Sequence, residues 1–179
     1  RLVKDLDEQI RSIKREAVKK VSKGTVISPS KWLVDAAMAS EHFDHFGEKV
    51  CIPNGIDLSL FNTSKGVNQR KNLGIADQEH VLLYTSGTLD NTRKGIDLML
   101  EALELLTIPV TVLTMGKGLV ETSNKAVKII PLGFLSEVGE IAACYAAADA
   151  FVLPSREDNL PNTMLESFAA GTPVISFSV

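Results

Sequence analysis

The sequence predicts an α/β protein built on a doubly wound parallel sheet, and two observations point to this fold class. From residue 79 onward, short apolar runs of strand length alternate with segments in which apolar residues recur every three or four positions. Such alternation is typical of parallel strands that are covered by helices on both faces. The second observation is a buried strand, a polar loop, a short helix and another buried strand in direct succession over residues 149–177.

The composition is that of a soluble globular domain with a full core. The chain has 179 residues, of which 45% are hydrophobic and 23% are charged. Its net charge of −3 gives no basic surface, so no nucleic-acid partner is expected. The two cysteines, Cys51 and Cys144, lack metal-ligand spacing and indicate a reducing, cytoplasmic setting. No apolar run approaches the roughly 18–20 residues of a membrane span.

The first part of the chain is predicted to hold short elements of its own. Residues 1–23 indicate an amphipathic helix, because apolar residues recur at three- and four-residue steps and the other face is charged. A surface helix is the favoured interpretation, and a membrane-surface helix is the alternative because lysines cluster at its end. A strand, a helix and a second strand follow, at residues 25–28, 31–40 and 49–52.

Three segments make up the predicted domain organisation. We expect residues 1–52 to be the tail of an N-terminal domain and residues 53–78 to be an inter-domain linker, which opens with a Pro-Asn-Gly turn signal. Within this linker, residues 62–78 are polar and are expected to hold a poorly defined helical turn. Residues 79–179 are expected to form the C-terminal domain. A sheet of this kind normally has a covering helix after its last strand, so we expect this domain to be truncated at its C-terminus.

About five parallel strands with intervening helices are predicted in the second domain. Each strand is a short apolar run, and each helix shows an apolar stripe at three- and four-residue spacing. Ser136 is the expected N-cap of the second helix. The strands are predicted at residues 80–84, 110–115, 127–130, 151–153 and 174–177, and the longer helices at residues 94–106 and 137–148.

Two polar turns follow the first two strands of this domain. In the first turn, Gly87 permits a tight bend, and Arg93 and Lys94 precede a helix N-terminus, where positive charge and backbone N–H groups favour a phosphate. An exposed loop with two solvated cations is the alternative. The second turn has glycines at 116 and 118, but Glu121 stands where a dinucleotide-binding fingerprint needs its third glycine.

The third polar turn carries two acids, Asp158 and Glu166, eight residues apart. Asp158 lies in the loop and Glu166 lies about one turn inside the following helix, so both can face the same crevice. A carboxylate can accept hydrogen bonds from two sugar hydroxyls at once. A capping aspartate with an exposed helix glutamate is the alternative. The convergence of three polar turns at one edge of the sheet favours the ligand-binding interpretation.

These residues resemble the C-terminal, donor-binding half of the retaining GT-B nucleotide-sugar glycosyltransferases, of the group 1 or family 4 type, which has a Rossmann-like sheet. The family's signature is Pro-Ser, an acid, seven residues, a Glu, and then Gly-Thr-Pro-Val. The matching positions here are Pro154, Ser155, Asp158, Glu166 and residues 171–174. Three further matches come in the family's order: a linker motif from Pro53, the Lys94-Gly95 turn, and the loop at residues 132–135.

The resemblance implies roles for the residues at the sugar end of the donor. Glu166 would accept the ribose hydroxyls, and Asp158 would contact the hydroxyls of the transferred sugar. Asp158 stands where the family usually has a Glu, and the neighbouring Glu157 competes for the same role. Asn162 and Thr163 stand where backbone N–H groups at the helix start meet the diphosphate.

The resemblance also implies a phosphate end and a base end. Lys94 would neutralise the diphosphate as it leaves. Many members carry Gly-Arg-Leu where this chain has Gly87, Thr88 and Leu89, and Arg93 is the candidate replacement for that arginine. The base would be bordered by Gly133, Phe134 and Leu135.

The activity implied by the resemblance is transfer of a glycosyl unit, with retention, from a nucleotide-diphosphate sugar such as a UDP- or GDP-sugar to a glycan or lipid hydroxyl. No cofactor and no metal are expected, and the sequence has no Asp-x-Asp motif. The acceptor would bind through the missing N-terminal domain, so the fragment alone is expected to be inactive. The full-length protein would be cytoplasmic, with peripheral contact at the inner face of the membrane as a further expectation. A non-catalytic nucleotide-sugar-binding or regulatory domain is the alternative.

Overall fold

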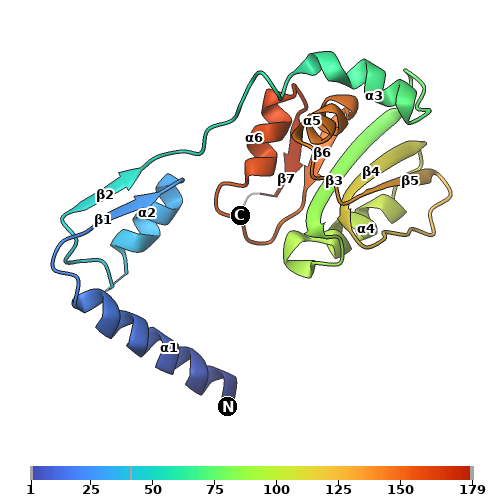
Figure 1. Cartoon of the computed structure of the whole chain (residues 1–179). Coiled ribbons are helices and arrows are strands. Elements are labelled where there is room, and N and C mark those ends of the chain that lie inside the picture. The colour runs from blue at the N-terminus through green and yellow to red at the C-terminus, as the bar shows by residue number, and fades with distance from the viewer. Residues whose placement is uncertain (1, 41, 178–179) are drawn as a thin grey trace. The chain divides into compact units, whose positions relative to one another are not determined.

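The computed structural model describes residues 2–40 and 42–177, and it divides the chain into two compact units with the boundary between Asn54 and Gly55 (Figure 1). The first unit contains a two-stranded parallel sheet and two helices. The Ser30 side chain accepts a hydrogen bond from the Leu33 N–H and thereby caps the second helix. The elements of this unit are α1 (Leu2–Lys19), β1 (Thr25–Ser28), α2 (Lys31–Met38) and β2 (Glu48–Cys51).

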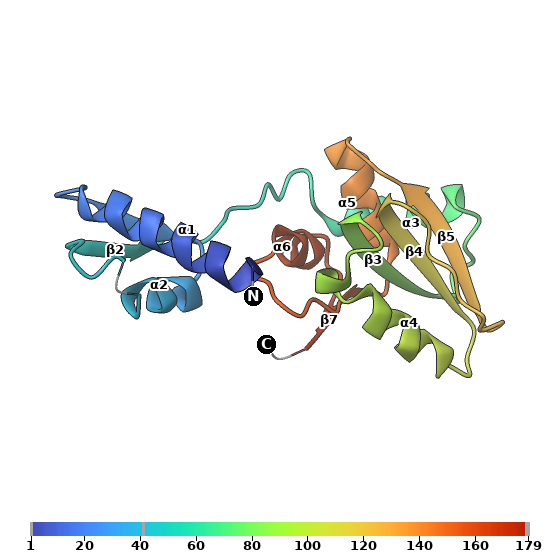
Figure 2. The same cartoon turned by 90° about the horizontal axis from the view of Figure 1, so that it is seen from below.

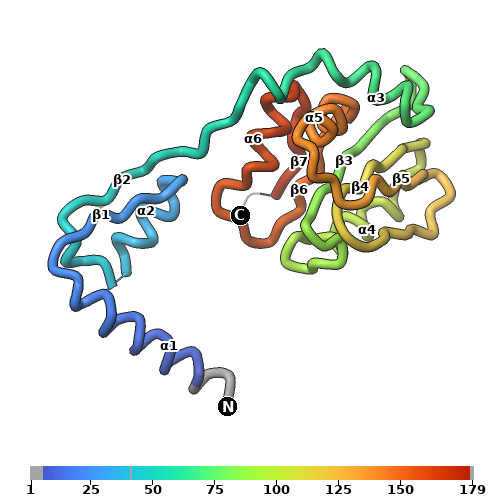
Figure 3. Tube along the Cα trace, viewed as in Figure 1, coloured from blue at the N-terminus to red at the C-terminus, as the bar shows by residue number. Residues whose placement is uncertain are grey.

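A five-stranded, all-parallel sheet forms the centre of the second unit, in the order β5-β4-β3-β6-β7. The prediction of a doubly wound sheet with five parallel strands is therefore confirmed. The chain runs outward from β3 through β4 to β5 and then returns to place β6 on the other side of β3 (Figure 3). The strands are β3 (His80–Thr88), β4 (Val110–Lys117), β5 (Val127–Gly133), β6 (Ala150–Leu153) and β7 (Val174–Ser176).

Helices cover both faces of this sheet (Figure 2). Alternate residues of β3 enter different clusters: Val81 and Leu83 pack with α5 (Val138–Ala147), while Tyr84 packs with α4 (Ile96–Glu104). The period of two along the strand therefore divides the core into two layers, as expected for a strand buried on both sides. Helix α6 (Asn162–Ala169) lies on the α5 side, where its Met164 packs against the α5 layer.

Residues 63–72, which the sequence placed in a linker, form a short 3-10 turn, η1 (Thr63–Lys65), and helix α3 (Gly66–Asn72). The Arg70 side chain holds this segment to the sheet, since its Nε donates to the Ala147 carbonyl at 2.8 Å and its Nη2 pairs with Asp149 at 2.7 Å. The other carboxylate oxygen of Asp149 accepts the Val81 N–H at 2.7 Å. Structurally, this segment packs as part of the second unit.

Two helix starts differ from the sequence prediction. Helix α4 begins at Ile96 because residues 92–94 form a separate 3-10 turn, η2 (Thr92–Lys94), which ends at Gly95 with φ of 73°. The expected N-cap of α5, Ser136, is wrong: Glu137 occupies that position, without a side-chain capping bond. No helix in the part of the chain that the structure describes is long and apolar enough to cross a lipid bilayer.

Candidate functional site

A cavity of about 150 Å³ opens where the strands of the second unit end. Strand order reverses between β3 and β6, and open α/β sheets bind ligands at the carboxyl ends of strands beside such a reversal. Several elements contribute to its walls, namely the ends of β3 and β4, the loop after β5, and helices α5 and α6. The lining residues are Thr85, Ser86, Gly87, Met115, Gly116, Phe134, Leu135, Ile141, Tyr145, Thr163 and Glu166.

Five residues predicted from the sequence lie together in the wall of this cavity: Gly87, Phe134, Leu135, Thr163 and Glu166. They come from segments up to 79 positions apart, so the fold has brought the predicted base, ribose and phosphate ends into one place. Gly133 and Asn162 each precede a lining residue in the chain and are not themselves part of the wall.

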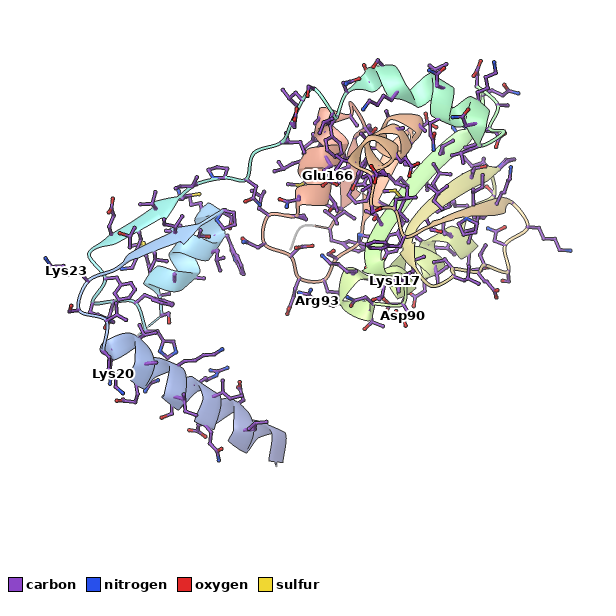
Figure 4. All side chains as sticks on the ribbon, viewed as in Figure 1. Lys20, Lys23, Asp90, Arg93, Lys117 and Glu166 are labelled. Carbon is purple, nitrogen blue, oxygen red and sulfur yellow. The ribbon has the colours of Figure 1, made fainter. Side chains whose placement is uncertain are left out.

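Glu166 projects from α6 and is half-buried (Figure 4). Burial raises the pKa of its carboxyl group above the ordinary value, and the nearby Tyr145 hydroxyl opposes that rise. Helix α6 starts just before it, with Pro161 at the N-cap position. Thr163, in the first turn of α6, lines the cavity, so the positive end of the α6 dipole lies at the cavity wall.

Lys94 and Asp158 do not line this cavity; they form an ion pair between the loops that follow β3 and β6. The Lys94 Nζ lies 2.5 Å from the Asp158 Oδ2, and the two side chains are 26% and 21% exposed. Gly95 fixes this arrangement, since a Cβ atom added there would lie 1.9 Å from the Pro154 carbonyl oxygen. The capping interpretation of Asp158 is wrong, because Pro161 is the N-cap of α6.

The second predicted cation, Arg93, is exposed (Figure 4). Arg156, which the sequence analysis did not single out, binds the loop that carries Arg93. The backbone N–H of Arg156 donates to the Arg93 carbonyl at 3.0 Å. The Arg156 guanidinium makes two bonds to Asp97, of 2.7 and 2.5 Å, and so lowers the pKa of that carboxyl to about 2. Glu157 is exposed in an open hollow beside Arg93 and Arg156, so it is Asp158 that contacts Lys94.

Two further side chains, one in the cavity wall and one in contact with it, were not predicted from the sequence. The Lys117 Nζ, at the end of β4, lies 5.4 Å from the centre of the Phe134 ring, which is 62% exposed. Tyr145 on α5 is completely buried and lines the cavity beside Glu166. Tyr145 has helical apolar spacing, which predicts a core residue and gives no sign that its hydroxyl faces a ligand site.

Among the described residues, no three or more His, Cys, Asp or Glu side chains gather as they would around a metal ion. The absence of a metal requirement stays a prediction.

Comparison with known proteins places the chain in a family. The family model described as "Glycosyl transferases group 1" matches residues 79–179. A D-inositol 3-phosphate glycosyltransferase of Geodermatophilus obscurus is 28% identical over 164 residues, which cover 79% of this chain and 36% of the relative. A putative teichuronic acid biosynthesis glycosyltransferase of Bacillus subtilis is 28% identical over 160 residues, covering 88% of this chain and 39% of the relative. The chain thus spans well under half the length of these relatives.

Solved structures show the same fold. The sucrose-phosphate synthase of Thermosynechococcus elongatus superposes with a TM-score of 0.72 at 22% identity, over 94% of this chain and 44% of that one. HepE of Anabaena, solved in complex with UDP-glucose, superposes with a TM-score of 0.64 at 23% identity, over 85% of this chain and 44% of that one. The five-stranded parallel sheet is that of the Rossmann-like C-terminal domain of GT-B glycosyltransferases. Sequence match and fold agree, and the chain belongs to the glycosyl transferases group 1 family.

Proposed function

We propose that this chain is the donor-binding part of a retaining glycosyltransferase, which transfers a glycosyl unit from a nucleotide-diphosphate sugar to an acceptor hydroxyl. The observation that carries the proposal is the position of Glu166: a half-buried carboxylate in the wall of a cavity at the point where strand order reverses. A carboxylate in that position is suited to accept hydrogen bonds from a pair of ribose hydroxyls.

The cavity and its neighbouring loops fit the parts of such a donor in order. The base would lie against Phe134 and Leu135, and the ribose against Glu166. The diphosphate would lie between the start of α6, where the helix dipole favours an anion, and Lys94. The transferred sugar would then reach Asp158.

The chain's residues would act on the reaction mainly through charge. As the bond between the sugar and the diphosphate breaks, negative charge grows on the leaving diphosphate. Lys94, Arg93 and the N-terminus of α6 would stabilise that charge, and no metal ion or other cofactor is required in this proposal. Replacement of Lys94 by alanine in the full-length enzyme is expected to lower turnover on the order of 10²-fold, as the loss of one charge-stabilising donor does elsewhere.

The site accounts for the donor, and the acceptor would bind elsewhere in the protein. We propose a glycan or lipid hydroxyl, bound by parts of the protein that its longer relatives possess. The relatives include a GDP-mannose-dependent mannosyltransferase of Mycobacterium tuberculosis, and HepE was solved with UDP-glucose, so UDP- and GDP-sugars are the donors to test first. The 179-residue chain alone is expected to bind nucleotide without turning over.

A thermal-shift panel of UDP, GDP, ADP, CDP and NAD on this chain tests the proposal. A ligand present at 100 times its dissociation constant stabilises the folded unit by about 2.7 kcal/mol. We expect at least one nucleoside diphosphate to raise the melting temperature and Glu166→Ala to abolish that rise. Stabilisation by NAD, with none by any nucleoside diphosphate, would overturn the proposal in favour of a dinucleotide-binding domain.

A further inference from the structure

A buried tyrosine hydroxyl at the cavity wall has no conventional partner. Tyr145 is 0% exposed and lines the cavity, and among the described residues its hydroxyl makes no regular hydrogen bond. Buried polar groups are normally paired, and an unpaired one destabilises the fold. Tyr145 differs from the buried Tyr84 in that it lines the cavity, so a bound ligand can change what surrounds its side chain.

Several contacts hold the Tyr145 ring and backbone in place. The ring packs edge-on against Phe151, with 5.4 Å between ring centres, and against Phe61 at 6.3 Å. Its carbonyl oxygen accepts a 2.6 Å hydrogen bond from the Thr172 hydroxyl, and the Ser167 hydroxyl donates to the Thr172 carbonyl at 2.8 Å. Because Ser167 follows Glu166 in α6, this network fixes the tyrosine relative to the helix that carries the acid.

A second polar side chain in the cavity wall is that of Glu166. Both side chains line the same cavity, one from α5 and the other from α6. Burial raises the pKa of Tyr145, and the proximity of Glu166 raises it further. Glu166 is thus the charged group near the Tyr145 hydroxyl, and among the described residues the two make no hydrogen bond of regular geometry.

We propose that Tyr145 is a positioning residue for Glu166, and this inference rests on the proposed function. When a nucleotide ribose enters, the Tyr145 hydroxyl donates a hydrogen bond of regular geometry to one carboxylate oxygen of Glu166. The carboxylate is then held in one orientation, with its other oxygen turned toward the ribose hydroxyls. The tyrosine does not touch the ribose; it acts through the acid.

Calorimetric titration of Tyr145→Phe tests this role, with UDP and GDP and their 2′,3′-dideoxy analogues as probes. The substitution removes one oxygen atom and keeps the ring. We expect it to weaken binding of the ribonucleotide roughly tenfold, in line with loss of a hydrogen bond to a charged group. The affinity for the dideoxy analogue should change less than about twofold, because that analogue has no ribose hydroxyls to donate to the Glu166 carboxylate.

Two controls separate positioning from packing. Tyr84 is 1% exposed and its hydroxyl likewise makes no regular hydrogen bond among the described residues, but it packs in the α4 layer of the core, so Tyr84→Phe should leave both affinities unchanged. In a Glu166→Gln background, Tyr145→Phe should add little further loss. The melting temperature of the ligand-free Tyr145→Phe chain should not fall, since the lost hydroxyl was unpaired.

The outcomes distinguish this inference from the function on which it rests. If the unaltered chain binds none of UDP, GDP, ADP and CDP, both the proposed function and the positioning role are refuted. If it binds one of them, and Tyr145→Phe weakens the ribonucleotide and the dideoxy analogue equally or weakens neither, only the positioning role is refuted. A lower melting temperature with equal losses would assign Tyr145 a packing role alone.

Discussion

Replacement of Asp158 by asparagine separates the two tasks that this acid would have in the site. The acid forms an ion pair with Lys94, with 2.5 Å between the charged atoms. With a donor bound, Lys94 would turn to the diphosphate and Asp158 to the hydroxyls of the transferred sugar. Asparagine keeps the size of the side chain and removes its charge, so the substitution affects the two tasks in opposite directions.

The burial of the ion pair sets the size of the effect on stability. An exposed pair contributes about 0–1 kcal/mol, and breaking a fully buried pair costs about 3–5 kcal/mol. The Lys94 and Asp158 side chains are 26% and 21% exposed, so we expect the Asp158→Asn chain to lose roughly 1–2 kcal/mol of folding free energy.

The effect on binding follows from the charge that is removed. At an effective dielectric constant of about 20, two unit charges 4 Å apart interact by about 4 kcal/mol, and solvent around this partly exposed pair reduces that figure. Removal of the carboxylate frees Lys94 and removes repulsion of the diphosphate, so UDP or GDP should bind about 1 kcal/mol tighter, or roughly fivefold. A nucleotide-sugar gains the same amount, but its sugar hydroxyls lose their hydrogen bonds to the charged Asp158 carboxylate. That loss is about 1.5–3 kcal/mol, so the nucleotide-sugar should bind more weakly.

Titration calorimetry with UDP, GDP, UDP-glucose and GDP-mannose, at low and high salt, measures both effects. The gain in affinity for UDP or GDP should shrink at high salt, because it is electrostatic. The matched control is Glu157→Gln, which removes the neighbouring exposed charge and does not touch Lys94. Weaker binding of UDP or GDP to the Asp158→Asn chain would contradict this prediction. So would a Glu157→Gln chain that also binds UDP or GDP more tightly and the nucleotide-sugars more weakly.

Three other predictions follow from the geometry of the site. Gly95→Ala should lower the free energy of unfolding by about 2 kcal/mol or more in a urea titration, because φ is 73° and the new Cβ would meet the Pro154 carbonyl; an unchanged midpoint would contradict this. Arg156 lowers the pKa of Asp97 from 3.8 to about 2, so the pair stabilises the fold above about pH 4, and that stability is lost as the pH falls toward 2. Asp97→Asn should therefore flatten the low-pH part of a plot of melting temperature against pH. A plot that the substitution leaves unchanged would contradict this prediction. Burial raises the pKa of Glu166 above 4.5, so nucleotide affinity should fall on acidification at a higher pH than for an ordinary glutamate; a pH-independent affinity would exclude the carboxylate from the contact.

The sequence predicted the sheet and the position of Glu166 because both depend on local patterns. Apolar runs of strand length and helical stripes specify which segments lie in the core, and parallel strands then bring their carboxyl ends to one edge. Glu166 lies one turn into a helix that starts at that edge, so its place in the cavity wall follows from its spacing. The same logic brought Gly87 and Phe134 to the cavity.

The polar pairs could not be predicted in the same way. Lys94 and Asp158 are 64 positions apart, and Arg156 and Asp97 are 59 apart, so no periodicity in the sequence links the partners. These pairs depend on how two loops are placed by the strands β3 and β6, which only the folded structure shows. Helix α3 was predicted only as a poorly defined helical turn for a related reason. Its polar sequence has a weak apolar stripe, and Arg70 holds it through contacts made 77 and 79 positions away.

A crystal structure of this chain with the nucleoside diphosphate that stabilises it most would test the central claim directly. The account predicts that the ribose hydroxyls lie within hydrogen-bond distance of the Glu166 carboxylate, with the base against Phe134 and the diphosphate between Lys94 and the start of α6. A nucleotide bound away from this cavity, or bound in it with its ribose out of reach of Glu166, would contradict the account.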